Sequence, residues 1–299
     1  MNLPINGGMT NKDIHDRRFY KAKQEARFVE KQTPSTPQTQ SEAYKLAFQD
    51  NEFMLREELR PVRFQLELLK PEMLLDEAGI ASTLVIYGSA RIPEPDKADA
   101  LLAAATDERG KIIAGRMKEK SRYYDEARKL AQLASSCGVE DEAGRHFVVC
   151  SGGGPSIMEA ANRGACDVGK ESIGLNIVLP HEQAPNIYVT PDLSFQFHYF
   201  ALRKMHFLIR ARAVAVFPGG FGTFDEFFEL LTLIQTGKIE RMPIMLFGGD
   251  FWNRVINFEE LMLEGVISPP DLELFQMVDT ADEAWAAICG FYNITPKVV

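Results

Sequence analysis

Residues 213–237 read AVAVFPGGFGTFDEFFELLTLIQTG, and this stretch decides the fold. Its first part, Ala213 to Phe217, is a short apolar run that stops at Pro218, which is typical of a buried strand in a parallel sheet. A turn follows that contains Gly219, Gly220 and Gly222. From Thr223 onward, apolar side chains recur at helical spacing until Gly237, so the stretch predicts a strand, a glycine turn and a helix in that order.

This order places backbone N–H groups at the N-terminus of a helix, where they bind anions and phosphate above all. Glycine suits such a turn because a Cβ would block the close approach of a ligand, and we expect positive φ at some of these positions. We therefore assign Gly219, Gly220, Gly222 and Thr223 to substrate binding. The alternative is an ordinary turn in which Thr223 and Glu226 form a capping box, so that Glu226 serves only the helix.

A second stretch, HFVVCSGGGPSIMEAANRGAC at residues 146–166, repeats this design. An apolar run leads into three glycines and a proline that starts a helix. Ser156 and Glu159 stand at the same spacing as Thr223 and Glu226. Two such turns in one α/β domain can face each other across the carboxyl ends of a parallel sheet, where ligands of these folds bind.

In this second turn we assign Gly153 and Gly154 to substrate binding. Glu159 holds the place that Glu226 holds on the other turn, and we predict that it contacts ribose hydroxyl groups. A capping box with Ser156 is the alternative for Glu159.

These segments resemble the LOG-type phosphoribohydrolases. PGGFGTFDE matches the PGGxGTxxE signature of that family, and LRKM at residues 202–205 is similar to its Arg-Lys element. SGGGPSIMEAANRGA and YGS at residues 87–89 are similar to its two earlier glycine segments, so the resemblance covers roughly residues 80–250. Members are often labelled lysine decarboxylases. The resemblance instead implies hydrolysis of the N-glycosidic bond of a nucleoside 5'-monophosphate, such as AMP or a cytokinin ribotide, to free base and ribose 5-phosphate.

Glu226 is the predicted catalytic carboxylate. Breaking an N-ribosidic bond develops positive charge on the sugar. A carboxylate beneath the sugar can stabilise that charge and orient the attacking water. Glu226 lies one helical turn beyond the predicted phosphate site, so a 5'-phosphate bound there would put the ribose near its side chain. The resemblance implies the same role.

Arg203 and Lys204 form a basic pair on a helix with an apolar stripe. Such a pair is usually a solvated edge, but the resemblance implies that Arg203 is a catalytic arginine against the phosphate or the leaving base. Permanent charge and forked donors suit that task. Lys204 points about 100° away and is assigned to substrate binding. The family label invites a pyridoxal phosphate Schiff base on Lys204, which nothing else in the sequence supports.

Four other side chains are candidates for the same site. Ser89 and Arg91 follow the first predicted strand and are similar in position to the first nucleotide-contact loop of the family, with a helix cap as the alternative for Ser89. His198 and His206 lie near the basic pair in sequence. They either line the pocket or serve packing.

Composition restricts the partners. A net charge of −9 argues against nucleic acid as the main partner. No stretch approaches the roughly 20 apolar residues of a membrane span, and the first residues lack the pattern of a signal peptide. The four cysteines and five histidines show no metal-ligand spacing, so we expect reduced thiols, no metal and no cofactor. We predict a cytoplasmic protein. Its extra N-terminal length resembles a longer LOG-type subgroup, which implies a homo-oligomer, a dimer or larger.

We divide the chain into a flexible N-terminal arm (1–40), a helical extension (41–79) that Pro61 interrupts, and a catalytic domain (80–299). In the third part strands alternate with helices, which predicts a Rossmann-like, doubly wound parallel α/β sheet of about six or seven strands flanked by helices. Residues 96–136 are expected to be helical with a break at the glycines 110 and 115, and residues 195–212 to form one helix. The proline-rich loop at 180–194 is long enough to be a lid or a binding loop.

Two other functions remain open from the sequence. A nucleotide- or phosphocofactor-binding carrier without catalysis has similar turns, and would bind a nucleotide without cleaving it. A pyridoxal-dependent decarboxylase would show visible absorbance.

Overall fold

The computed structural model describes residues 21–180 and 184–295. Its contacts divide the chain into two units, one ending at Arg63 and one beginning at Phe64. The first holds helix α1 (Ala22–Gln32), single 3₁₀ turns at 42–44, 47–49 and 57–59, and the short helix α2 (Asn51–Met54). The domain boundaries predicted at residues 40 and 79 stay predictions. Residues 1–20 of the predicted arm lie outside the described ranges.

Helix α3 (Arg60–Glu77) corrects the expected break at Pro61. Proline is tolerated in the first turn of a helix because the N–H that it lacks has no partner there anyway. Pro61 therefore lies in the first turn of α3 rather than at a boundary between two helices. The same helix also contains Pro71.

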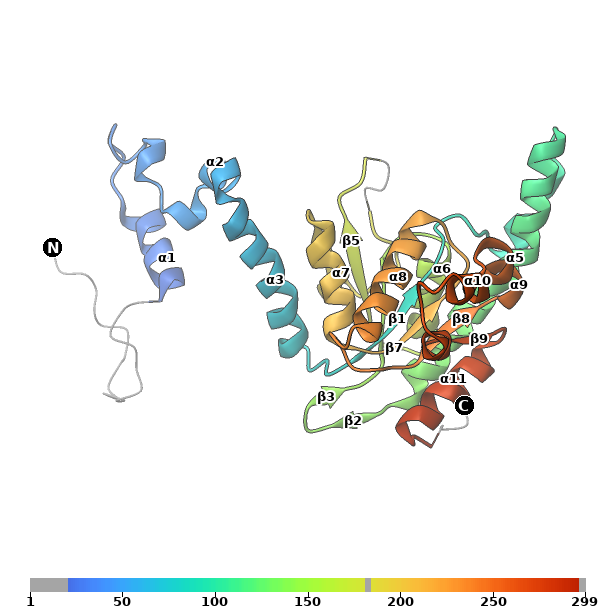
Figure 1. The fold of residues 1–299 in the computed structure, drawn as a ribbon. Coiled ribbons are helices and arrows are strands. Elements are labelled where there is room, and N and C mark those ends of the chain that lie inside the picture. The colour runs from blue at the N-terminus through green and yellow to red at the C-terminus, as the bar shows by residue number, and fades with distance from the viewer. Residues whose placement is uncertain (1–20, 181–183, 296–299) are drawn as a thin grey trace. The chain divides into compact units, whose positions relative to one another are not determined.

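The second unit is built on a parallel sheet of seven strands, drawn in Figure 1 with helices on both sides. Strand order is β6-β5-β4-β1-β7-β8-β9. The strand bounds are β1 Thr83–Tyr87, β4 Val148–Ser151, β5 Ser172–Ile177, β6 Ser194–Phe197, β7 Ala211–Val216, β8 Ile244–Phe247 and β9 Gln276–Val278. The predicted doubly wound sheet of six or seven strands is thereby confirmed.

Helices cover both faces of this sheet. On one face lie α5 (Glu108–Cys137), α6 (Ile157–Asp167) and α11 (Ala281–Tyr292). On the other lie α7 (Phe200–Ile209), α8 (Phe221–Gln235), α9 (Gly249–Val255) and α10 (Phe258–Leu263). Helix α4 (Pro95–Ala104) and the hairpin β2 (Glu140–Asp141) and β3 (Gly144–Arg145) complete the unit.

The central strand β1 is largely apolar because both of its sides are covered. In β1, Leu84 and Ile86 join the cluster beneath α5 and α6, whereas Val85 and Tyr87 join the cluster beneath α7 and α8. All four side chains are buried. The periodicity of two that marks a half-exposed strand is therefore absent, as the sequence indicated for these runs.

Strand order reverses around β1, which pairs with β4 on one side and with β7 on the other. The chain runs outward from β1 through β4 and β5 to β6, then returns to β7 and continues to β9. Open α/β sheets bind ligands at such a reversal, outside the carboxyl ends of the strands. The two glycine turns follow β4 and β7, so the topology brings them to either side of the end of β1.

Two predicted helices end differently in the structure. The region 96–136 breaks before Asp107, whose side chain accepts a hydrogen bond from the Gly110 N–H and so caps α5, and both predicted break glycines lie inside that helix. The region 195–212 is not one helix, because β6 occupies residues 194–197 and α7 begins only at Phe200. Pairing of β6 with β5 stabilises that strand.

Candidate active site

A cavity of about 1080 Å³ opens where β1, β4 and β7 end. Helix α7 contributes Arg203 to its lining and α8 contributes Glu226. Residues from the three strand ends line the same cavity: Gly88, Ser89, Gly152, Pro218, Gly219, Gly220, Gly222 and Thr223. The structure therefore brings both predicted catalytic side chains and most of the predicted binding residues into one space.

The turn after β7 is open toward this cavity. Helix α8 begins at Phe221 with Gly220 as its N-cap, and a Cβ on Gly220 or Gly222 would meet no atom within 4 Å. Glycine at 219 has a packing reason, because its Cβ would lie 2.2 Å from Oγ1 of Thr223. The expected positive φ is wrong for this turn, since none of its three glycines has one.

The capping-box interpretation of Thr223 and Glu226 is also wrong. Thr223 is the third residue inside α8 and its side chain is buried, while no side chain caps the N-terminus of that helix. The first N–H groups of a helix have no partner within the helix. In α8 they are located where the turn lines the cavity, as a phosphate site requires.

The turn after β4 is closed by packing. Gly152, Gly153 and Gly154 are buried, and Gly153 has a φ of 72°. The Asn186 amide donates hydrogen bonds to the carbonyl oxygens of Gly153 (3.1 Å) and Gly154 (3.0 Å). Of the three glycines, only Gly152 lines the cavity. A role of Gly153 and Gly154 in substrate binding stays a prediction.

Helix α6 likewise lacks the capping box that was the alternative interpretation of Ser156 and Glu159. Ser156 is its N-cap residue but has a φ of 65°, and its hydroxyl donates to the Ile92 carbonyl instead of capping the helix. Glu159 accepts a hydrogen bond from the Tyr124 hydroxyl at 3.0 Å. Glu159 is not among the residues that line the cavity, so the two equivalent carboxylates differ in their surroundings.

Ser89 connects two of the turns. Its N–H donates to the Pro218 carbonyl at 3.2 Å, which ties the end of β1 to the turn after β7. Its hydroxyl accepts from the Arg91 N–H at 3.0 Å, so it closes a local turn rather than capping a helix.

Arg203 and Glu226 form an ion pair, with 3.3 Å between Nη1 and Oε1. Both side chains are largely withdrawn from solvent, with 10% of Arg203 and 14% of Glu226 exposed. Arg203 Nε donates to the Leu175 carbonyl at 2.7 Å, and its guanidinium lies 5.0 Å from the centroid of the Phe207 ring. These contacts fix the direction of the arginine toward the cavity.

Burial raises the pKa of the Glu226 carboxyl to about 7, although Arg203 opposes the shift. Desolvation disfavours the charged form of an acid, and nearby Asp225 adds to the effect. A carboxyl group that titrates near neutral pH can accept a proton from water and release it again, which is the property that a general base needs.

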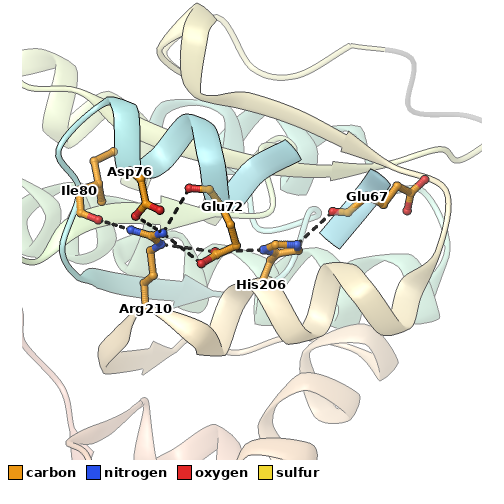
Figure 2. A network of polar contacts seen from close by, with 6 residues as sticks. All are labelled: Glu67, Glu72, Asp76, Ile80, His206 and Arg210. Atoms are coloured by element: carbon orange, nitrogen blue, oxygen red, sulfur yellow. Dashed lines mark hydrogen bonds and ion pairs between the residues drawn. The ribbon is translucent and has the colours of Figure 1, made fainter. Parts of the chain in front are cut away.

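Helix α7, which carries Arg203, is bound at both ends by polar side chains of α3. The Glu67 carboxylate accepts hydrogen bonds from the backbone N–H groups of His198 (2.9 Å) and Tyr199 (3.2 Å), just before α7 begins. At the other end of α7, Arg210 is paired with Glu72 (3.0 Å) and Asp76 (2.7 Å). Figure 2 shows the contacts that Arg210 and His206 of this region make with α3 and with the Ile80 carbonyl. Both ends of α7 are therefore anchored.

His206 belongs to this anchoring network and is absent from the cavity lining. Its Nε2 lies 3.1 Å from the Glu67 carbonyl oxygen, which can only accept, so Nε2 carries the hydrogen. Burial lowers the pKa of this imidazole, although the Glu72 carboxylate 3.5 Å from its Nδ1 opposes the shift. The packing alternative is the correct one for His206.

Lys204 lies outside the cavity lining. Its ammonium is paired with Asp225 (3.2 Å) and Glu229 (3.1 Å) of α8. Residues 100° apart on a helix face different surroundings, and here one neighbour faces the cavity while the other joins α7 to α8 at the surface.

Several cavity residues had not been predicted. Helix α5 contributes Ile113, Arg116, Met117 and Lys120, whose spacing of three and four residues places them on one helical face. That spacing is visible in the sequence, but nothing in the sequence indicates that this face of the helix points into the cavity. The loop after β5 also lines the cavity, through Leu179, Ala184 and Pro185. Residues 181–183 of the predicted lid lie outside the described ranges.

Within residues 21–180 and 184–295, no cluster of three or more His, Cys, Asp or Glu side chains is arranged to hold a metal ion. In the same ranges, no helix has the length and apolar character to span a bilayer. The side chains of Cys137, Cys150 and Cys289 are buried, and that of Cys166 is exposed.

Comparison with known proteins adds the following. The family model described as "Possible lysine decarboxylase" matches residues 158–288. A cytokinin riboside 5'-monophosphate phosphoribohydrolase of Arabidopsis thaliana is 27% identical over 169 residues, which are 55% of this chain and 74% of that protein. A probable enzyme of the same description from Oryza sativa subsp. japonica is 26% identical over 173 residues, with the same coverage. These matches confirm the resemblance predicted from the sequence.

Among solved structures, the molybdenum cofactor binding protein of the phototrophic bacterium Rippkaea orientalis aligns with a TM-score of 0.43 at 16% identity. The alignment covers 71% of this chain and 98% of that one. The molybdenum cofactor carrier protein of Chlamydomonas reinhardtii aligns with a TM-score of 0.41 at 16% identity, covering 71% and 99%.

Proposed function

We propose that this chain, a relative of the LOG-type phosphoribohydrolases, hydrolyses the N-glycosidic bond of nucleoside 5'-monophosphates. AMP and N6-modified adenine ribotides are the proposed substrates, and free base and ribose 5-phosphate are the products. One observation carries the proposal: Glu226 and Arg203 are paired inside the same cavity onto which the open N-terminus of α8 faces.

The N-terminus of α8 and the Glu226 side chain have separate roles in this reaction. Backbone N–H groups of Gly220 to Thr223 bind the 5'-phosphate, because the start of α8 is free of side-chain caps. Glu226, one turn further along α8, then lies beside the ribose. Its carboxylate stabilises the positive charge that develops on the sugar as the bond to the base breaks.

Glu226 also orients the attacking water and takes its proton, while the hydroxide part bonds to the anomeric carbon and the base leaves with the bonding electron pair. The proton returns to the departing base. A carboxyl with a pKa of about 7 can do both at neutral pH. Arg203 keeps Glu226 in position and supplies permanent positive charge near the phosphate or the leaving base.

Product analysis tests the proposal. The purified chain is incubated with AMP, isopentenyl-AMP and the other common nucleoside monophosphates, and released bases and ribose 5-phosphate are separated by chromatography. We expect equal amounts of free base and ribose 5-phosphate from at least one adenine nucleotide. Tight binding of every nucleotide without release of base would contradict hydrolysis and favour a carrier.

We also propose that the protein is cytoplasmic and forms a homo-oligomer. Leu66, Leu69 and Met73 lie along α3 at helical spacing and are each at least half exposed. An apolar stripe of this kind favours a contact with another chain. Light scattering on the eluate of a size-exclusion column measures the assembled mass, and a monomer at micromolar concentration would contradict this.

A further inference from the structure

One wall of the cavity is basic, and two of its three cations come from α5, a helix to which the proposed function assigns no residue. Arg116 and Lys120 lie four residues apart on α5, and Arg91 follows the end of β1. All three line the cavity that also contains Arg203 and Glu226. The chain as a whole is acidic, with a net charge of −9. A group of cations facing one cavity is therefore a local feature and not a consequence of composition.

The basic residues of α5 differ in their pairing according to the side that they face. Lys111 is paired with Glu108 at 3.2 Å, Lys118 with Asp99 at 2.5 Å, and Arg122 with Asp279 at 3.0 Å. These three residues lie on the same helix as Arg116 and Lys120, but none of them lines the cavity.

In contrast, Arg91, Arg116 and Lys120 have no carboxylate within 4 Å among the residues that the structure describes. Arg109 on the exposed first turn of α5 also has no ion pair there. Lack of a partner alone is thus not unusual. Here, however, three cations without a carboxylate partner come from two separate segments and line the same cavity. This arrangement indicates an anionic ligand.

Lys120 is held where its charge is unfavourable. Its ammonium donates a hydrogen bond to the Arg116 carbonyl oxygen. Burial lowers the pKa of Lys120, and the positive charges of Arg254 and Arg116 lower it further, while Glu119 opposes the shift. A cation that is partly desolvated beside like charges is stabilised when an anion binds, and such positions are enriched at functional sites.

The cavity also has room for more than one anionic group. Its volume of about 1080 Å³ lies at the upper end of the range for pockets that enclose drug-sized ligands. The start of α8 offers the place for one phosphate, and Arg91, Arg116 and Lys120 stand on other elements of the lining.

We propose that Arg91, Arg116 and Lys120 form a second anion site, and that the cavity binds nucleotides with a further phosphate beyond the one held at α8. This rests on the proposed function in one respect, namely that a nucleotide 5'-phosphate occupies the α8 turn. The shared chemistry is a second phosphate, attached either to the first one or to the ribose. ADP and adenosine 3',5'-bisphosphate represent these two cases.

Calorimetric titration with AMP, ADP and adenosine 3',5'-bisphosphate tests the proposal. All proteins are the full chain with Glu226→Gln, so that turnover does not disturb the equilibrium. We expect at least one of the two ligands with a second phosphate to bind about tenfold more tightly than AMP, as charge-assisted hydrogen bonds to one phosphate provide. Whichever ligand shows the preference identifies where the second phosphate is attached.

Adding Arg116→Gln and Lys120→Gln removes two of the charges and keeps helix-forming side chains. The ratio of the dissociation constants for AMP and the preferred ligand should then fall to near one. Lys118→Gln is the matched control, because it removes a charge from the same part of α5 that is paired with Asp99, and it should keep the ratio. No preference over AMP, or a ratio that survives the double substitution, would overturn the second site. Product analysis of the unsubstituted chain runs in parallel, so that a failure to cleave any nucleotide counts against the proposed function alone.

Discussion

Gly152 and Gly153 after β4 lie against other side chains, whereas Gly220 and Gly222 after β7 lie against open space. A Cβ on Gly152 would come within 2.6 Å of Nη2 of Arg203, and one on Gly153 within 2.4 Å of the Asn176 amide. On Gly220 or Gly222 it would meet nothing within 4 Å. After β4, glycine leaves room for the side chains of Arg203 and Asn176. After β7, glycine leaves the backbone N–H groups accessible from the cavity. The same glycine pattern therefore has a packing reason in one turn and an accessible backbone as its reason in the other.

The carboxylates that follow the two turns differ in the same way. Glu226 faces the cavity and is paired with Arg203, while Glu159 accepts a hydrogen bond from Tyr124. Five predictions test this contrast.

Exchange of each glutamate for glutamine should separate the two turns most strongly. Glu226→Gln keeps the size of the side chain but removes the base, so we expect kcat for AMP to fall by about 10²- to 10⁴-fold. Glu159→Gln can still accept from Tyr124, and we expect kcat to stay within about threefold of the unsubstituted value. Rates of adenine release measure both. A similar loss in the two variants would show that the turns act alike.

The pH dependence of activity should contain the titration of Glu226. If its ionised form is the active one, log(kcat/KM) rises by one unit per pH unit below pH 7 and levels above the pKa of about 7. Rates of adenine release between pH 5 and pH 9 measure this profile. The profile of Glu159→Gln should have the same midpoint, and a midpoint near pH 4.5 would contradict the assignment.

The same raised pKa has a consequence for stability with a definite sign. The unfolded chain loses the Glu226 proton near its ordinary value of 4.5, but the folded chain keeps it up to about 7. The folded state therefore binds more protons in between, and the free energy of unfolding falls as the pH rises through this window, by at most about 3 kcal/mol. Denaturant unfolding of the unsubstituted chain and Glu226→Gln at pH 5 and pH 8 isolates this contribution, which the glutamine variant should lack.

Alanine at one glycine of each turn should have opposite effects on stability. Gly153→Ala places a Cβ at a φ of 72° and against Asn176, so we expect a loss of about 2 kcal/mol or more. Gly222→Ala lies inside the first turn of α8, where alanine is favoured over glycine by up to about 1 kcal/mol. Thermal unfolding measures both. For Gly222→Ala we also expect a raised KM, since its Cβ extends into the cavity.

Much of the fold could be predicted because it depends on local patterns. Short apolar runs such as residues 213–217 indicated buried strands, and the glycines marked the turns that end β4 and β7. What could not be predicted depends on partners far along the chain. The segment SFQF at 194–197 leads into an aromatic-rich helix, and only its pairing with β5 makes it a strand. The start of α5 was misplaced because Asp107 outweighs the glycines that follow it.

The candidate site was predictable to the same extent. Arg203 and Glu226 are 23 residues apart, and two neighbouring βα connections bring them together, so their pairing follows from topology. The contact of Glu159 with Tyr124 spans 35 residues and joins two helices, so nothing in the local sequence distinguishes it from Glu226. The cavity face of α5 has a visible spacing, but the direction of that face is set by packing against α6 and the sheet.

The smallest expected effect is that of Lys204, which does not line the cavity and joins α7 to α8. It pairs with Asp225 and Glu229 at the surface, where each ion pair contributes up to about 1 kcal/mol. Lys204→Gln should therefore lower the free energy of unfolding by a similar amount and leave kcat/KM for AMP within about threefold. Arg203→Gln is the comparison, because it removes a charge from the cavity side of the same helix. A loss for Lys204→Gln as large as that for Arg203→Gln would place the lysine at the reacting atoms. Visible absorbance from bound pyridoxal, lost in that variant, would have the same meaning.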